Sequence, residues 1–122
     1  MLPMNECTQN GHVRVLIVDD APMMRRAIRE ILYRKEGIEV VGTAANGREA
    51  LEKIEQLQPD VVTLDIDMPV MNGITTVKNI MIRHRIPVVM ISSLVEDGYF
   101  AFEALRLGVM DFIPKPSRVN GG

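Results

Sequence analysis

Five short runs of apolar, mostly β-branched residues are distributed along the chain, and polar residues follow each run. The runs are Val13–Val18, Ile38–Thr43, Val61–Leu64, Val88–Ile91 and, more weakly, Asp111–Ile113. Runs of this length with little alternation between apolar and polar positions are typical of parallel strands that are covered on both faces of a sheet. The pattern therefore predicts five parallel β-strands.

Segments with helical periodicity fill the gaps between these strands. We expect one helix from Pro22, a second behind Asn46, a third from Gly73, and a shorter fourth around Phe102 and Leu105 that Gly108 ends. Asp20 is expected to cap the first helix, and Asn46 with Glu49 three residues later resembles a capping box. Strands that alternate with helices through short connections predict a doubly wound α/β fold.

The size and composition of the chain fit one ordinary globular domain. It has 122 residues, of which 47% are hydrophobic and 25% are charged. A net charge of −2 does not suggest direct nucleic-acid binding, and no apolar run approaches the roughly 18 residues that span a membrane. The start of the chain lacks the pattern of a signal peptide, and a single cysteine, Cys7, allows no internal disulfide. These features are typical of a cytoplasmic protein.

The ends of the chain differ from its middle. The polar, aperiodic residues 1–12 are expected to form a disordered leader, residues 13–117 the domain, and residues 118–122 the start of a linker. No fifth helical pattern follows the last strand, so one face of the sheet would keep an uncovered apolar strip. Because such strips usually find a partner, we expect a fragment of a longer protein that can self-associate.

Polar residues that can take part in chemistry end four of the five predicted strands. Asp19 and Asp20 end the first strand, Asp65 ends the third, Ser92 ends the fourth, and Lys115 follows the fifth. Ligands of open α/β sheets bind beyond the carboxyl ends of the strands. We therefore expect these side chains to converge on one site.

Carboxylates that converge in this way repel one another unless a cation neutralises them. Oxygen ligands in a small open site suit Mg²⁺, which keeps part of its water shell. A carboxylate can also act as a nucleophile and become an acyl phosphate. Phosphoryl transfer mainly requires positioning and charge neutralisation, which Mg²⁺ on one side and Lys115 on the other would supply, with a hydrogen bond from Ser92. No glycine-rich phosphate loop is present, so nucleotide binding is not indicated.

The segments that carry these residues resemble bacterial response-regulator receiver domains. Four blocks, Val-Leu-Ile-Val-Asp-Asp, Leu-Asp-Ile-Asp-Met-Pro-Val-Met-Asn-Gly, Met-Ile-Ser-Ser and Pro-Lys-Pro, are similar to the signature blocks of that family. Their order and spacing are more specific than any single block. The resemblance spans residues 13–117 and implies a flavodoxin-like sheet of strand order 2-1-3-4-5. Members of the family usually finish with a fifth helix, which we do not expect in this sequence.

The resemblance implies roles for the acidic residues of the site. Asp65 would be the phosphoacceptor. Asp19, Asp20 and Asp65 would hold Mg²⁺ together with the main-chain carbonyl of Asp67. The domain would not be an enzyme in its own right.

Three further residues would couple phosphorylation to conformation. By resemblance, Ser92 is the switch hydroxyl, Lys115 senses the phosphoryl group, and Phe112 is the aromatic residue that changes rotamer on activation. A sensor histidine kinase would donate the phosphoryl group. An output domain or partner protein would then respond at the face formed by the predicted fourth helix and the fifth strand.

Three segments point to one branch of this family. Ile38–Ala44, Val88–Leu94 and Val109–Ser117 are similar to the receiver half of the chemotaxis protein-glutamate methylesterases. Pro22 and Asn72 depart from the residues usual there, but neither belongs to the proposed chemistry. The chain contains no methylesterase domain, so we do not expect that activity from it.

An enzyme is the alternative. Asp65-Ile66-Asp67 is similar to the Asp-x-Asp motif of haloacid-dehalogenase-type phosphatases, which also form a phosphoaspartate. In those enzymes the motif follows the first strand of a larger fold, whereas here it follows the third predicted strand. Turnover of a small phosphomonoester would favour the enzyme, and stoichiometric labelling would favour the switch.

Overall fold

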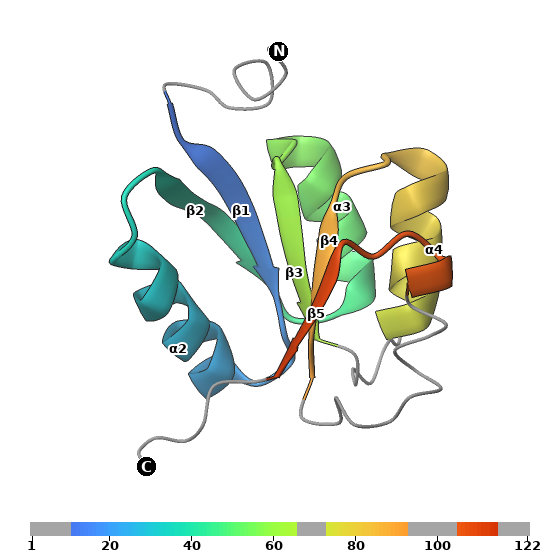
Figure 1. Ribbon diagram of the computed structural model, residues 1–122. Helices are drawn as coiled ribbons and strands as arrows, with labels where there is room; N and C mark the ends of the chain where they lie inside the picture. The colour runs from blue at the N-terminus through green and yellow to red at the C-terminus, as the bar shows by residue number, and fades with distance from the viewer. Residues whose placement is uncertain (1–10, 66–72, 93–104, 115–122) are drawn as a thin grey trace.

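The structure is a computed structural model that describes residues 11–65, 73–92 and 105–114. Within these ranges helices flank a parallel β-sheet (Figure 1). The elements are β1 (Val13–Val18), α2 (Pro22–Tyr33), β2 (Ile38–Ala44), α3 (Gly47–Leu57), β3 (Val61–Asp65), α4 (Gly73–Arg83), β4 (Val88–Ser92) and β5 (Asp111–Pro114).

The strands lie in the order β2-β1-β3-β4-β5, and every neighbouring pair is parallel. This arrangement confirms the predicted doubly wound α/β fold and its flavodoxin-like order. The chain leaves β1 toward one edge of the sheet and leaves β3 toward the other. In folds of this type, ligands bind at this point of reversal, beyond the carboxyl ends of the strands, here those of β1 and β3.

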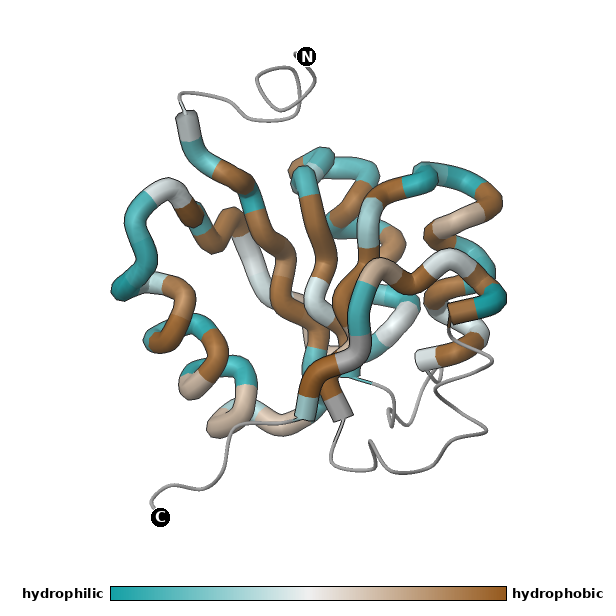
Figure 2. The backbone as a smooth tube through the Cα atoms, in the orientation of Figure 1, coloured by the Kyte–Doolittle hydropathy of each residue, from teal (hydrophilic) through white to brown (hydrophobic). Residues whose placement is uncertain are grey.

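Among the described residues, one helix packs on one face of the sheet and two helices pack on the other. On one face, Ile54 of α3 and Ile80 of α4 belong to a core that includes Leu64 and Met90 of the strands. On the other face, Ile28 of α2 packs with residues of β1. Figure 2 shows that apolar residues run along the strands, as expected for a parallel sheet that is buried on both faces.

Beside α2, the less covered face carries an apolar groove of about 380 Å³. Ile31 and Leu32 of α2 form one side, and Val89 and Ile113 lie on the other, across the strands. Thr63 supplies the only hydroxyl among the described lining residues. The apolar strip expected from the sequence stays a prediction, because what covers this face depends also on residues outside the described ranges. The expected absence of a fifth helix concerns residues after Pro114, which lie outside the described ranges.

The predicted strands agree with the observed ones to within a residue at each end, and α2, α3 and α4 begin where expected. The segment expected around Phe102 and Leu105 is described only from Leu105, which is helical, and Gly108 has a positive φ of 107°. One detail is wrong: Ala21, not Asp20, is the N-cap of α2, and its side chain makes no capping bond. With Pro22 at the first helical position, the residue before it is the cap.

The capping box predicted for α3 is confirmed. The Asn46 side chain accepts a hydrogen bond from the backbone N–H of Glu49 at 2.9 Å, and the Glu49 carboxylate accepts one from the backbone N–H of Ala45. At the other end, Gln58 adopts a left-handed conformation with φ 50°. Its carbonyl accepts a hydrogen bond from the Arg14 guanidinium at 2.7 Å, which ties the end of α3 to β1.

Candidate functional site

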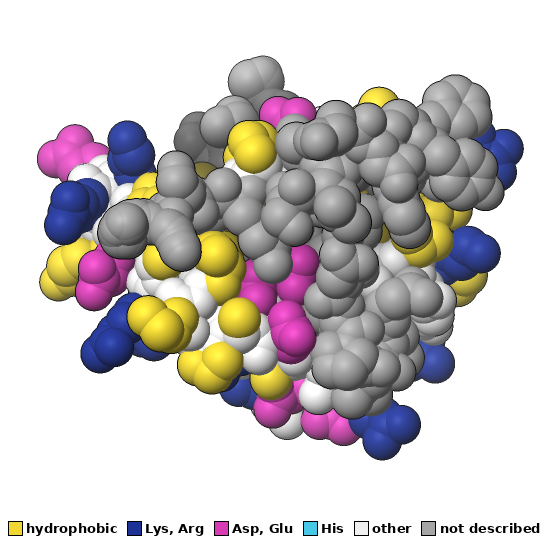
Figure 3. All heavy atoms as spheres, turned by 90° about the horizontal axis from the view of Figure 1, so that it is seen from below, with side chains coloured by type: hydrophobic (Ala, Val, Ile, Leu, Met, Phe, Trp, Pro, Cys, Tyr) yellow, Lys and Arg dark blue, Asp and Glu magenta, His cyan; other side chains and the backbone are white. Residues whose placement is uncertain are grey.

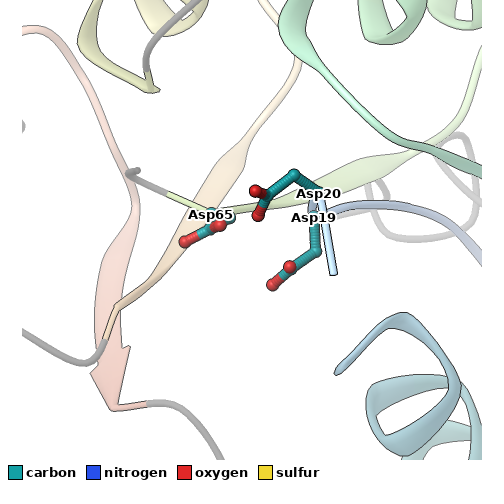
Figure 4. Close-up of side chains that lie close together, drawn as sticks. All are labelled: Asp19, Asp20 and Asp65. Carbon is teal, nitrogen blue, oxygen red and sulfur yellow. The ribbon is translucent and has the colours of Figure 1, made fainter. Parts of the chain in front are cut away.

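Three carboxylates meet at the carboxyl ends of β1 and β3. Oxygen atoms of Asp19, Asp20 and Asp65 all lie within 4.8 Å of one another. Asp19 and Asp65 are buried, with 0% and 1% of their surface exposed, whereas Asp20 is exposed. Figure 4 shows the three side chains side by side beyond the two strands. The convergence expected from the sequence is confirmed for these residues.

The strand register explains why the acids meet. Val18 of β1 is the partner of Leu64 of β3, so the next residue of each strand, Asp19 or Asp65, lies at the same level of the sheet. Asp65 is in turn the partner of Ile91 of β4, which makes it the carboxylate of a strand that is paired on both sides. Seen from the end of the molecule at which the strands finish, acidic side chains gather near the centre, with apolar side chains beside them (Figure 3).

Local hydrogen bonds fix the turn that carries Asp19. Its carboxylate oxygen Oδ1 accepts the backbone N–H of Ala21 at 2.9 Å, and its own N–H donates to the carbonyl of Ala44 at 3.0 Å. The Arg25 guanidinium donates to the Asp19 carbonyl at 2.7 Å. The turn is therefore held from β2 and from α2, which keeps Asp19 pointing into the cluster.

The donor set fits Mg²⁺. Burying two adjacent carboxylates is costly unless positive charge compensates them. All three groups offer hard oxygen donors, and the exposed position of Asp20 leaves room for the water ligands that Mg²⁺ retains. The cluster is therefore suited to a small divalent cation.

The remaining predicted site residues are described only in part or not at all. Ser92 ends β4 and is the register partner of Pro114, so its backbone adjoins the residue that precedes Lys115. Phe112 lies in β5 as the partner of Met90. The side chains of Ser92 and Phe112, and the whole of Asp67 and Lys115, lie outside the described part of the structure. Their roles stay predictions.

Sequence reasoning missed Arg25, which supports the site through the Asp19 carbonyl. A bond from a long side chain to a main-chain oxygen leaves no motif in a sequence. The available signal was position: Arg25 lies one helical turn after Ala21, on the helix that follows the acidic pair.

Comparison with known proteins decides the family. The family model for the response regulator receiver domain matches residues 15–121, which is most of the chain. The chain belongs to this family. The receiver domain is also 51% identical, over 106 residues, to a protein-glutamate methylesterase/protein-glutamine glutaminase of Methanococcoides burtonii. That match covers 86% of this chain but 30% of the relative, so the receiver domain spans about a third of the relative's length.

Solved structures give the same result. The receiver domain aligns with the response regulator domain of Thermotoga maritima CheB at a TM-score of 0.82 and 47% identity, covering 86% of this chain and 79% of that one. It also aligns with a chain of the complex between the P1 domain of CheA3 and CheY6 from R. sphaeroides, at a TM-score of 0.76 and 36% identity, covering 91% and 87%. The predicted resemblance to receiver domains, and to the receiver half of the methylesterases, is confirmed.

The phosphatase alternative gains no support from these matches. Asp65 also ends β3, the central strand, rather than the first strand of the chain, where that enzyme class carries its motif. Within the described residues of the receiver domain, no helix combines the length and the apolar character needed to cross a membrane.

Proposed function

We propose that this receiver domain is a phosphorylation-dependent switch in which Asp65 accepts a phosphoryl group with the help of Mg²⁺. The observation that carries the proposal is the setting of Asp65. It is a buried carboxylate at the end of the central strand, with oxygen atoms of Asp19 and Asp20 within 4.8 Å. This setting would bring a nucleophile and a cation site together.

Asp65 would act as the nucleophile toward a phosphohistidine of a sensor kinase. One of its carboxylate oxygens forms a bond to phosphorus while the phosphorus–nitrogen bond breaks, and the donor imidazole leaves with the bonding electrons and takes a proton from solvent. Asp19, Asp20 and Asp65, with the main-chain carbonyl of Asp67, would hold Mg²⁺, which would supply positive charge to the phosphoryl oxygens. Lys115 and Ser92 would contact the remaining oxygens.

The ends of β4 and β5 would transmit the conformational change that follows phosphorylation of Asp65. Ser92 adjoins Pro114 in the register of the two strands, and Phe112 lies two residues before Pro114. A hydroxyl drawn toward the phosphoryl group would therefore shift the edge of the sheet on which Phe112 lies. We propose this edge, with the helix that ends near Gly108, as the surface that an output domain or partner protein reads.

The similar proteins suggest the pathway. The receiver domain is about half identical to the matching part of a named methylesterase, and a chain of the CheA3 P1–CheY6 complex shares its fold at 36% identity. We therefore propose a chemotaxis-type histidine kinase as the donor, a cytoplasmic location, and a methylesterase domain as the output. Methylesterase activity itself is assigned to that separate domain and not to this chain.

The test is labelling by a small phosphodonor. Acetyl phosphate with Mg²⁺ is expected to add a single phosphate to the protein, measured by intact-mass spectrometry, and chelation of the metal is expected to prevent it. Asp65→Asn should abolish the adduct, because an amide is not a nucleophile of this kind. Glu52→Gln, which changes an exposed acid on α3, is the matched control and should label normally. An undiminished adduct on Asp65→Asn would contradict the assignment.

A further inference from the structure

A pocket of about 340 Å³ lies at the amino ends of β3 and β4, where α3 and α4 both end. This is the edge of the sheet opposite to the acid cluster, and the ends of the two helices lie at the top of the molecule in Figure 1. We call it the helix-end pocket. Its lining includes three apolar side chains that are buried or partly buried, Ile54, Pro59 and Ile86, and three polar ones, Glu55, Arg83 and His84.

Hydrogen bonds hold both turns that frame the helix-end pocket. Gln58, which follows α3 and also lines the pocket, accepts the Arg14 guanidinium on its carbonyl at 2.7 Å. After α4, the N–H groups of His84 and Arg85 both donate to the Ile80 carbonyl, at 2.7 and 2.8 Å. Gln58 and Arg85 have φ angles of 50° and 57°, the left-handed conformation that turns a chain sharply at the end of a helix. The walls of the pocket are therefore fixed by the fold.

Two opposite charges share this pocket without pairing. Glu55 and Arg83 both line it and are both exposed. Within the described part of the chain, neither side chain makes a hydrogen bond or an ion pair. A carboxylate and a guanidinium are thus both accessible to a ligand that lies between them.

Helix stability accounts for Arg83 but not for Glu55. Arg83 is the last residue of α4, where the helix dipole favours a positive charge. Glu55 lies in the last turn of α3, where the same dipole disfavours a carboxylate, and this turn contains no basic residue. A positive group beside Glu55 would remove the penalty, and the last carbonyls of α3 would offer it further acceptors. The α3 side of the pocket is therefore suited to an ammonium group.

We propose that the helix-end pocket binds a free α-amino acid with an apolar side chain. The ammonium group of the ligand donates to the Glu55 carboxylate, and its carboxylate accepts from the Arg83 guanidinium. Its side chain lies against Ile54 and Pro59. Glu55 disfavours a ligand that is only an anion, and Arg83 disfavours one that is only a cation. The volume of the pocket is in the range of small-molecule sites.

The inference goes beyond the phosphoacceptor role and does not depend on it. The helix-end pocket lies at the amino ends of the strands, whereas Asp65 and its neighbours lie at the carboxyl ends. A failure to bind an amino acid would leave the labelling of Asp65 by acetyl phosphate unaffected. A failure to label would likewise leave the pocket in place.

The test is an NMR titration of the full 122-residue chain with L-leucine. Amide shifts are expected to change at Glu55, Gln58 and Ile86, with a dissociation constant on the order of 1 mM. L-leucinol, which has a hydroxymethyl group in place of the carboxylate, and N-acetyl-L-leucine, which lacks the ammonium group, are the matched ligands. Each should bind about fivefold more weakly than L-leucine, since each loses one exposed ion pair.

Two variants assign the two charges of the ligand. Glu55→Gln should weaken the binding of L-leucine about fivefold but should not weaken that of N-acetyl-L-leucine, which has no ammonium group to lose. Arg83→Gln should weaken L-leucine by a similar factor but should not weaken L-leucinol, which has no carboxylate.

The control variants are Glu52→Gln and Arg48→Gln, which change exposed residues of α3 that do not line the pocket. Both should bind L-leucine as the parent does, and thermal melting checks that all four variants remain folded. Equal weakening in the controls would show that net charge alone is responsible and would overturn the proposal. Equal affinity for the three ligands, shifts confined to other elements, or no shifts with L-leucine would also overturn it.

Discussion

Asp19 lies beside Asp65 because Val18 and Leu64, the residues that precede them, are partners in the parallel register of β1 and β3. A slip of one residue would turn one carboxylate to the opposite face of the sheet. The geometry of the site is therefore set by the pairing and packing of the apolar strand residues that precede the acids. Hydrophobic burial, rather than attraction among the acids, brings the like charges together.

Removal of Asp20 should weaken metal binding more than it affects folding. Its side chain is exposed, but its oxygen lies within 4.8 Å of oxygens of Asp19 and Asp65. We expect Asp20→Ala to lower the Mg²⁺ affinity at least about tenfold, because the cation loses a charged oxygen ligand. Isothermal titration measures the effect, and Glu52→Ala on α3 serves as the control. Unchanged affinity in Asp20→Ala would remove Asp20 from the proposed ligand set.

Replacement of Thr63 by valine should stabilise the domain. The Oγ1 hydroxyl of Thr63 is buried in the apolar groove and has no hydrogen-bond partner in the described part of the protein. Valine keeps nearly the same shape but has no hydroxyl to bury. Thr63→Val should therefore raise the free energy of unfolding by on the order of 1 kcal/mol. Urea denaturation measures it. The reverse change at a fully buried neighbour, Val62→Thr, should destabilise, and a loss of stability in Thr63→Val would mean that the hydroxyl is satisfied.

The end of α3 offers a second stabilising change. Gln58 has a φ of 50°, a left-handed conformation that costs a residue with a side chain roughly 1 kcal/mol but costs glycine little. Gln58→Gly should therefore raise the melting temperature, while the bond from Arg14 to the carbonyl is retained. Gln56→Gly, inside the same helix, should lower the melting temperature, because glycine costs a helix interior a comparable free energy. A lower melting temperature in both variants would show that the conformation of Gln58 carries no strain.

Removal of the side chain that caps the start of α3 should destabilise the domain. Asn46→Ala removes the side-chain acceptor of the Glu49 N–H and should cost about 1 kcal/mol of stability, the usual effect of losing an N-cap. Asn79→Ala removes an exposed side-chain bond to the Thr75 carbonyl within α4 and should have little effect. The two variants are compared by equilibrium unfolding in urea. Equal losses of stability in the two variants would indicate that the cap of α3 contributes no more than an ordinary exposed hydrogen bond.

Sequence patterns predicted the elements well because each depends on neighbouring residues. The apolar runs placed the strands, and Asn46 with Glu49 placed the start of α3. The acids at the strand ends were also predictable, since a parallel sheet brings these ends to one edge. The cap of α2 was assigned to Asp20, because an acidic residue near Pro22 resembles a cap, although Ala21 holds that position.

Long-range contacts were not predictable in the same way. The bond from Arg25 to the Asp19 carbonyl depends on how α2 leaves the turn. The groove that Arg25 and Arg29 line with Thr43 depends on the approach of β2 to α2. A helical pattern in the sequence marks which residues face the core. It does not show which neighbouring strand the remaining side chains meet.

The unequal cover of the two sheet faces predicts how β4 tolerates substitution. Val88 and Met90 are fully buried on the face that α3 and α4 cover, whereas Val89 between them is partly exposed in the apolar groove. A larger side chain at Val88 or Met90 would collide with close-packed neighbours, but the same change at Val89 would extend into open space. In a saturation mutagenesis profile, Val89 should therefore tolerate larger side chains, whereas Val88 and Met90 on either side of it should not.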